Sequence, residues 1–147
     1  MPEFKPGDVV EIRTDAGLRY AVVTHDHPSY PTVVQVMAGA YQTRPDNLAG
    51  IVEGKAAFTA MVPLRGVLSK LDLVHEVAGT VDLGATSARF PTFRMPIRDK
   101  QGEIVYWWFW DGRGLSYEVD PGTERDALPL REVMSAGRFR DHLTESA

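Results

Sequence analysis

The chain of 147 residues contains no cysteine, and this absence removes three classes of protein. Without thiols there is no disulfide-stabilised scaffold, no zinc site built from thiolates and no cysteine nucleophile. Long apolar runs are missing too, whereas a membrane-spanning helix needs roughly 18 to 20 consecutive apolar residues. The opening residues, MPEFKPG, do not begin the apolar stretch of a signal peptide. We therefore expect a cytoplasmic protein that has no membrane partner.

Positive charge is also scarce. Lys and Arg number 16 against 20 Asp and Glu, which gives a net charge of -4. A surface that grips phosphate groups needs the opposite sign, so we expect no nucleic-acid partner. The sequence also lacks the Gly-x-Ser-x-Gly elbow of many hydrolases and the Gly-rich loop with lysine that binds nucleotide phosphates. We predict no cofactor, and an enzyme is the less favoured class.

What the sequence does contain is a series of short apolar segments separated by 13 glycines and 10 prolines. They predict a mainly β protein with a minor helical part. Residues 8–13, 18–24 and 32–37 have strand length and turn-sized gaps, which is typical of an antiparallel meander. Strands this short favour small SH3-like barrels over a sandwich. Further strands are expected at 57–62, 71–78, 104–110 and 115–119.

Two segments that begin with proline predict short helical turns, PLRGVLS at 63–69 and PLREVMS at 129–135. Proline suits the first turn of a helix, and Gly137 is expected to end the second one. The residues that follow, 141–147, are mostly polar and predict a frayed tail.

The two PLR segments share five residue types in register, and upstream of them residues 20–39 align without gaps on residues 93–112. We expect residues 1–147 to form one compact unit. A duplication would divide this unit into halves 1–78 and 79–147, each a hairpin followed by a PLR turn, as two pseudo-repeated lobes. The alternative is chance, because five identities in a short window are not rare.

The segment His25-Asp26-His27 is the one cluster that resembles a catalytic site. Two histidines that are two positions apart on an extended segment point to the same side, as ligands of a divalent ion do. Further ligands would have to come from distant residues such as His75 or His142. The alternative interpretation is a solvated loop, because Asp-His-Pro is typical of turns.

The run Tyr106-Trp107-Trp108-Phe109-Trp110 holds all three tryptophans of the chain. On a strand, Tyr106, Trp108 and Trp110 share one face. The run is a core strand if both faces are buried, and a binding patch if one is open, because Trp and Tyr dominate interface hot spots. Residues 111–132 then bring six acidic residues against three arginines. The predicted partner-binding residues are Tyr106, Trp108, Trp110, Asp111, Glu118 and Glu124.

The N-terminal half resembles a known family. The residues that carry the resemblance are Phe4-x-Pro6-Gly7-Asp8-Val9-Val10-x-Ile12, then Leu18-Arg19-Tyr20-Ala21-Val22-Val23, then Phe58-x-x-x-Val62-Pro63-Leu64. This pattern is similar to the immunity 26 family of small bacterial proteins linked to polymorphic toxin systems. The resemblance implies an SH3-like, β-rich fold and a toxin as partner. The name phosphotriesterase is also attached to this family, so the resemblance leaves an enzyme open.

Two hypotheses of different class follow. In the first, the chain is a non-catalytic immunity protein that neutralises a cognate toxin, and its acidic surface steers a basic toxin domain into the complex. In the second, it is a metal-dependent hydrolase of the phosphoester type, in which His25 and His27 hold an ion that activates water.

Overall fold

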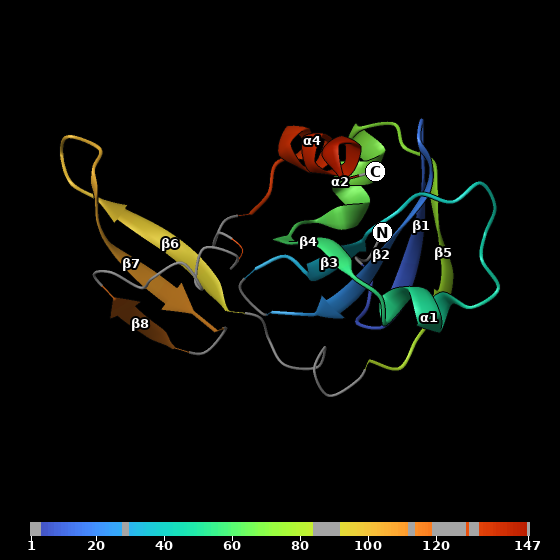
Figure 1. Cartoon of the computed structure of the whole chain (residues 1–147), viewed down its shortest axis with the longest axis horizontal. Helices are drawn as coiled ribbons and strands as arrows, with labels where there is room; N and C mark the ends of the chain where they lie inside the picture. The colour runs from blue at the N-terminus through green and yellow to red at the C-terminus, as the bar shows by residue number, and fades with distance from the viewer. Residues whose placement is uncertain are drawn as a thin grey trace. The chain divides into compact units, whose positions relative to one another are not determined.

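In the computed structural model, the residues described are 4–27, 30–83, 92–111, 114–118, 129 and 133–146. They divide into two compact units (Figure 1). Unit 1 consists of Met1–Ala88 and Val133–Ala147, and unit 2 of Arg89–Glu132. Unit 1 contains β1 (Asp8–Thr14), β2 (Gly17–His25), β3 (Val33–Met37), α1 (Leu48–Val52), β4 (Ala56–Met61), α2 (Leu64–Lys70), β5 (His75–Thr80) and α4 (Ala136–Glu145). Unit 2 contains β6 (Phe93–Arg98), β7 (Ile104–Trp110) and β8 (Leu115–Glu118).

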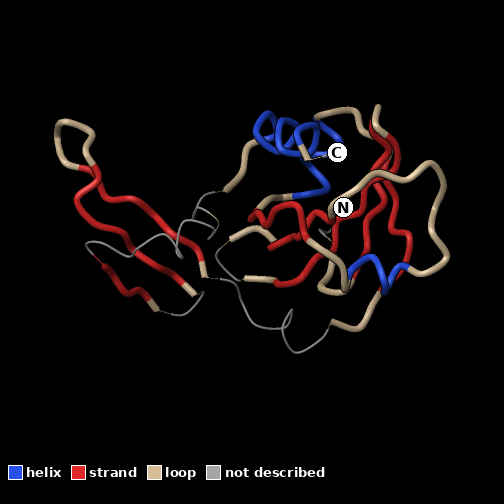
Figure 2. The backbone as a smooth tube through the Cα atoms, in the orientation of Figure 1, coloured by secondary structure: helices blue, strands red, loops and turns tan. Residues whose placement is uncertain are grey.

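The prediction of a mainly β fold with short helices is confirmed, since the described strands form two antiparallel sheets (Figure 2). The sheet of unit 1 has the strand order β4-β3-β2-β1-β5. Its edge strands, β4 and β5, are not paired with each other, so the described strands form an open sheet and no closed barrel. None of the helices in the described part of the chain has the length and apolarity to span a membrane.

Both faces of the unit 1 sheet are buried at its central strand β2, and this differs from the alternation expected of a half-exposed strand. Strand β2 is buried at every position from Leu18 to Thr24. On one face, Val10 and Val23 belong to a core that includes residues of α2 and α4. On the other face, Val9 and Val22 belong to a second core packed against α1. Alternation along the predicted strands places one set of apolar residues inward, and this set is buried apart from Phe58, which is partly exposed; its buried members are Val9, Ile12, Tyr20, Val22, Val34, Val36 and Met61.

A buried arginine on β2 holds helix α4 against the sheet. Arg19 is fully buried, and its guanidinium donates hydrogen bonds to the carbonyl oxygens of Leu143 and Met37 and to the hydroxyl of Ser146. Leu143 and Ser146 lie at the end of α4, where helix carbonyls lack partners inside the helix. The guanidinium thus neutralises the negative end of the helix as well as fixing its position.

Two predictions for the C-terminal segment were wrong in the residues that the structure describes: the helical turn that ends at Gly137, and the frayed tail at 141–147. Val133 is not helical but forms a parallel bridge with Met61, and residues 130–132 of PLREVMS lie outside the described residues. Ser135 caps α4 by accepting a hydrogen bond from the backbone nitrogen of Arg138. Gly137 therefore lies in the first turn of a helix instead of ending one. The expected polar tail belongs mainly to this helix, because Phe139 and Leu143 face the core.

The two segments of the predicted repeat each contain an antiparallel strand pair. Strands β2–β3 and β6–β7 are both antiparallel pairs, and three cross-strand pairs of the first recur in the second after adding 73 to each number (94 − 21 = 73). Ala21–Val36 corresponds to Arg94–Phe109, Val22–Gln35 corresponds to Met95–Trp108, and Val23–Val34 corresponds to Pro96–Trp107. The units do not divide at position 78/79, because β5 spans it and the C-terminal segment returns to unit 1.

Candidate protein-binding surface

One face of the unit 2 sheet consists entirely of apolar and aromatic residues. Because alternate residues of a strand point to opposite faces, the cross-strand pairs determine which side chains share a face. Tyr106, Trp108 and Trp110 share one face of β7, as predicted, and each is paired with a residue of a neighbouring strand. We call the set the aromatic face; its members are Phe93, Met95, Ile97, Tyr106, Trp108, Trp110, Leu115 and Tyr117.

The aromatic face has a buried end and an exposed end. At the buried end, Phe93 and Trp110 have ring centroids 6.0 Å apart, and Trp110 is only 7% exposed. Its expected place on an open patch is therefore wrong, because the tryptophan packs at the base of the hairpin. On the adjacent edge strand, Leu115 and Tyr117 are 52% and 65% exposed. The accessible part of the face lies on the β8 side.

Three rings form the exposed end, which we call the aromatic triad: Tyr106, Trp108 and Tyr117. Their centroids are 5.9 to 6.3 Å apart, and each ring contacts the other two. Tyr106 and Trp108 are half-buried, and Tyr117 is exposed. Tilted and edge-on contacts of this kind are favourable in themselves, so the rings are held in place before any partner binds. A fixed aromatic surface loses little conformational entropy on binding.

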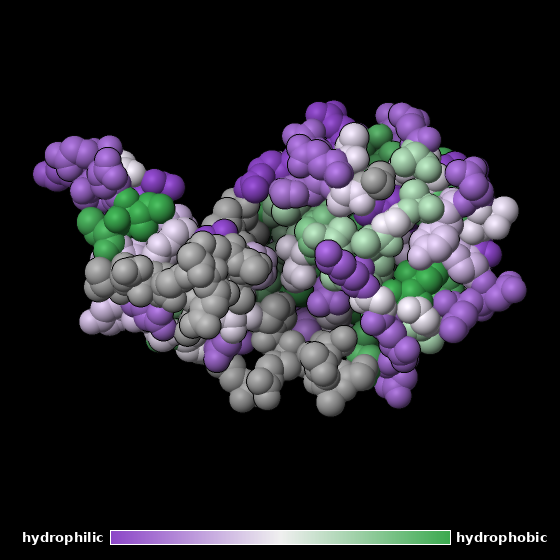
Figure 3. Space-filling view, in the orientation of Figure 1, coloured by the Kyte–Doolittle hydropathy of each residue, from purple (hydrophilic) through white to green (hydrophobic). Residues whose placement is uncertain are grey.

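The opposite face of the same sheet is mixed in character. The guanidinium of Arg94 lies 5.0 Å from the ring centroid of Trp107, a cation–π contact that covers part of the ring. Glu118 pairs with Trp107 and Ser116 with Phe109, so both β8 side chains are on this side. Figure 3 also shows apolar atoms beside the hydrophilic tip of the β6–β7 hairpin, in the region where Ile104 and Val105 are exposed.

The predicted acidic residues do not gather beside the triad. Glu118 lies on the face opposite Trp108. Asp111 is exposed at the end of β7, where its carboxylate accepts a hydrogen bond from the backbone nitrogen of Gly114. Glu124 lies outside the described residues. Of the three predicted acidic residues, Asp111 is the one that the structure places at an end of β7.

Leu115 and Tyr117 were missed by the sequence interpretation, although a signal for them exists. If β8 folds back on β7 through the turn at 111–114, Tyr117 must lie opposite Trp108, and Leu115 opposite Trp110. Alternation then places both on the same face as the tryptophans. In the pattern Leu-Ser-Tyr-Glu, the apolar residues lie on the aromatic face, and the polar residues lie on the opposite face of the sheet.

The histidines of the alternative metal site lie near the end of β2. His25 is the last residue of that strand, and its Nδ1 is 2.8 Å from the hydroxyl of Thr24. His27 lies beyond the strand and makes an edge-on ring contact with Tyr30. The proposed distant ligands have other contacts: His75 packs on Phe4, and His142 on Phe58. Among the residues that the structure describes, no group of three metal-ligating side chains is found.

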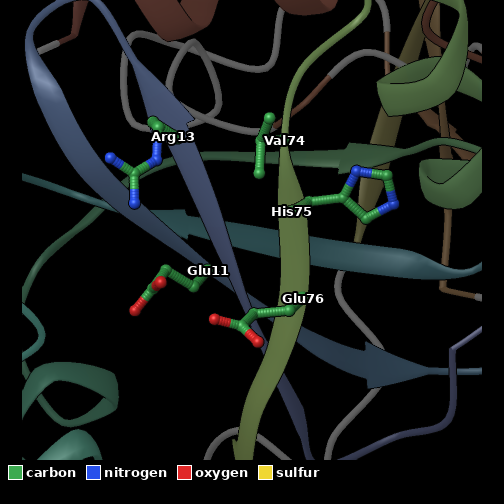
Figure 4. Close-up of a pocket in the computed structure, with 5 residues that line it drawn as sticks. All are labelled: Glu11, Arg13, Val74, His75 and Glu76. Carbon is green, nitrogen blue, oxygen red and sulfur yellow. The ribbon is translucent and has the colours of Figure 1, made fainter.

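A buried carboxylate in unit 1 was also missed. Glu11 on β1 lies opposite Glu76 on β5, and Arg44 bridges the two. The Nε atom of Arg44 donates to Oε2 of Glu11 at 2.7 Å, and the hydroxyl of Tyr20 donates to the same oxygen at 2.8 Å. Figure 4 shows the two carboxylates on one side of the strands and the ring of His75 turned away from them. The adjoining cavity of about 200 Å³ is lined by Glu11, Arg13, Val74, His75 and Glu76.

The two carboxylates of this cluster share one arginine, Arg44. The hydrogen bonds from Arg44 hold the pKa of Glu11 below its ordinary value of 4.5, against the opposing effect of burial. Burial and the hydrogen bond to Glu11 raise the pKa of Tyr20. At neutral pH the cluster is an ionised carboxylate between a protonated tyrosine and an arginine. Such an arrangement ties β1, β2 and the β3–α1 loop together, and neither Glu11 nor Tyr20 is poised to exchange a proton near neutral pH.

Comparison with known proteins identifies no relative: no family model, no curated protein and no solved structure matches the chain.

Proposed function

We propose that this chain is a non-catalytic binding protein that recognises a protein partner through the exposed end of the aromatic face. The observation that carries the proposal is the aromatic triad: Tyr106, Trp108 and Tyr117 form one contiguous surface in which Tyr117 is 65% exposed. Aromatic side chains of this type dominate the energy of protein interfaces, whereas a soluble protein gains nothing from leaving them in water.

The chemistry of the partner follows from charge. The chain carries a net charge of -4, and residues 111–132 hold six acidic residues against three arginines. An acidic protein associates fastest with a basic one, because the long-range field steers the encounter. Toxins that act on nucleic acids are basic because they bind phosphate groups with Lys and Arg. This chain is acidic, so its charge is complementary to that of such a toxin. Together with the resemblance to the immunity 26 family, this supports a bacterial immunity protein that binds its basic toxin domain in the cytoplasm.

A binding experiment with matched surface variants tests the proposal. The probe is a purified basic toxin domain encoded beside this gene. In the unit 2 variant, Leu115→Ser and Tyr117→Ser remove exposed apolar side chains from β8. In the control, Val74→Ser and Val77→Ser remove comparably exposed side chains (68% and 44%) from unit 1. Both variants leave the described buried cores unchanged.

We expect the unit 2 variant to weaken binding by at least about 2 kcal/mol, or roughly 30-fold in Kd. The control should bind like the wild-type protein, and only the wild type and the control should protect cells that express the toxin. Equal binding by both variants would show that the aromatic face is not the interface. The metal-dependent hydrolase stays a prediction; stoichiometric metal in the purified protein that is lost in His25→Ala would favour it.

A further inference from the structure

The two units differ in how many buried side chains their described residues contain. In unit 1, two buried cores lie on opposite faces of a five-stranded sheet, and both cores are built from residues of that unit. Unit 2 has one sheet of three strands. Its buried apolar side chains, among the residues that the structure describes, are those of Phe93, Phe109 and Trp110. Each unit therefore has buried residues of its own, and unit 1 has far more of them.

Burial in the described part of unit 2 is concentrated at one end of its sheet. On β7, Phe109 and Trp110 are buried, whereas Ile104 and Val105 at the other end of the strand are exposed. The first three residues of β8 are exposed as well. The hydrophobic contribution to stability follows the apolar area removed from water, and three strands are about the minimum for a sheet that is stable by itself. The sheet of unit 2 is therefore held together more weakly than that of unit 1.

Unit 1 holds both of its chain segments by contacts within the unit. Near the end of the first segment, the backbone nitrogen of Val81 donates to the carbonyl oxygen of Gly7 at 2.8 Å. At the start of the second, Val133 forms a bridge with Met61, and the backbone nitrogen of Met134 donates to the carbonyl oxygen of Met61 at 2.9 Å. Helix α4 is then held by the buried arginine of β2. None of these hydrogen bonds involves β6, β7 or β8, so they can persist when those strands separate.

The turn of the β6–β7 hairpin is stabilised by local hydrogen bonds. Arg98 donates to the carbonyl oxygen of Gly102 at 2.8 Å, and the carboxylate of Asp99 accepts from the backbone nitrogen of Glu103 at 3.0 Å. These partners are four positions apart in the sequence, whereas the arginine of β2 and its acceptor on α4 are 124 positions apart. Local contacts form and break without displacing distant segments, which favours opening of the hairpin as one piece.

We infer that unit 2 opens as a separate cooperative unit while unit 1 stays folded. Regions with little buried apolar surface open at a lower free energy than the core of the same protein, and a chain with two compact units need not unfold in one step. The pairing of β7 with β8 assembles the aromatic triad, so the opening of unit 2 separates its rings. A ligand of the triad therefore stabilises unit 2 and leaves the stability of unit 1 unchanged. The opening itself is a property of the free chain and does not depend on the proposed function.

Tryptophan fluorescence measures the opening of unit 2, because all three tryptophans lie in β7. Amide resonances of β2 in 15N-labelled protein measure the unfolding of unit 1. Both signals are recorded for the full chain over the same urea series. We expect the midpoint of the fluorescence transition to lie at least about 1 M urea below the midpoint at which the native β2 resonances are lost.

Matched variants at equivalent positions of the two hairpins sharpen this test. Phe109→Leu truncates a buried side chain of β7, and Val36→Ala truncates its equivalent on β3. Phe109→Leu should lower the fluorescence midpoint by at least about 0.5 M urea and leave the β2 midpoint unchanged. Val36→Ala should lower the β2 midpoint and leave the fluorescence midpoint unchanged. If Phe109→Leu leaves unit 2 unfolded in water, the β2 resonances should still have their native positions.

Equal midpoints for fluorescence and the β2 resonances in the wild-type chain would show that the two units unfold together, and this would overturn the inference. Loss of the β2 resonances before the fluorescence change would overturn it as well. So would a Phe109→Leu variant that shifts both midpoints equally, or one in which unit 2 and the β2 resonances are lost together in water.

Discussion

The meanders β2–β3–β4 and β6–β7–β8 are both antiparallel, but their described residues differ in exposure. In unit 1, helices α2 and α4 cover one face and α1 the other, and all seven residues from Leu18 to Thr24 are buried. In unit 2, Leu115 and Tyr117 remain exposed.

The difference lies in the connections and not in the strands. A repeated register shows that the backbone of a three-stranded meander tolerates very different side chains, since Val34 and Val36 correspond to Trp107 and Phe109. Covering a face requires additional chain, which residues 38–55 supply in unit 1. Large rings on a sheet without such a cover reduce the exposed area by packing on one another, as the aromatic triad does.

Helix α4 is one of the covers, and Arg19 is predicted to be the residue that holds it. Arg19→Ala should lower the free energy of unfolding by about 3–5 kcal/mol, because it leaves buried carbonyls without donors and opens a cavity. Urea unfolding measures the loss. The control is Arg140→Ala on the exposed side of the same helix, whose contact with Asp141 is 3.8 Å long and should contribute less than about 0.5 kcal/mol. Equal effects of the two substitutions would contradict the role of Arg19.

The two ends of the aromatic face should respond differently to truncation. Trp110→Ala, at the buried end, is expected to destabilise the protein by about 3–4 kcal/mol. Tyr117→Ala, at the exposed end, should cost less than about 1 kcal/mol, since most of the ring is already in water. Thermal unfolding of both variants decides the matter. A large loss for Tyr117→Ala would mean that the triad is core and not a binding surface.

Glu11, the buried carboxylate of unit 1, predicts that the free energy of unfolding depends on pH. The aromatic face contains no such group. The pKa of Glu11 is lower in the folded chain than in the unfolded one, so its contribution to stability is complete above the unfolded value of about 4.5 and is lost as the pH falls through the folded value. Glu11→Gln should cost about 1–3 kcal/mol at pH 7. The difference between the two proteins should shrink in acid. Unfolding curves at pH 7 and pH 3 measure it, and a cost that grows in acid would contradict the ion pair with Arg44.

The smallest expected effect concerns charge at the end of the aromatic strand. Asp111→Lys should slow association with a basic partner about 3- to 10-fold at low salt, with little change in the dissociation rate. The effect should decline as salt screens the charges. Asp46→Lys, an equal change of charge at an exposed site of unit 1, serves as the control in stopped-flow measurements. The two variants would be indistinguishable if only the net charge mattered.

Strand positions were readable from the sequence because the local signals were strong. Residues 104–110 were predicted as the strand that β7 proves to be, and β1 to β4 differ by one residue or so at their ends. Turn residues fix these boundaries: Gly17 has a φ of +131°, and a Cβ atom there would lie 2.8 Å from the carbonyl oxygen of Tyr41. Such positions favour glycine over any other residue.

What the sequence did not show were features that depend on distant contacts. Helix α4 contains glycine and mostly polar residues, and only Phe139 and Leu143, four positions apart, indicate its buried side. The cluster of Glu11, Arg44 and Glu76 joins three separate segments, so no local pattern predicts it. The proposed binding surface was half predicted: Trp108 was identified from β7 alone, whereas Tyr117 follows only once the β8 pairing is known.

The three tryptophans provide the most direct test of the central claim, that the exposed end of the aromatic face binds the partner. They report on three environments of one sheet: Trp107 on the mixed face, Trp108 in the aromatic triad and Trp110 in the buried end. Fluorine NMR of protein labelled with 5-fluorotryptophan gives one resonance for each, assigned by Trp→Phe substitution. On addition of the basic toxin domain, we expect the resonance of Trp108 to move while those of Trp107 and Trp110 stay in place. Movement of Trp107 alone, or of none of the three on formation of a tight complex, would contradict it.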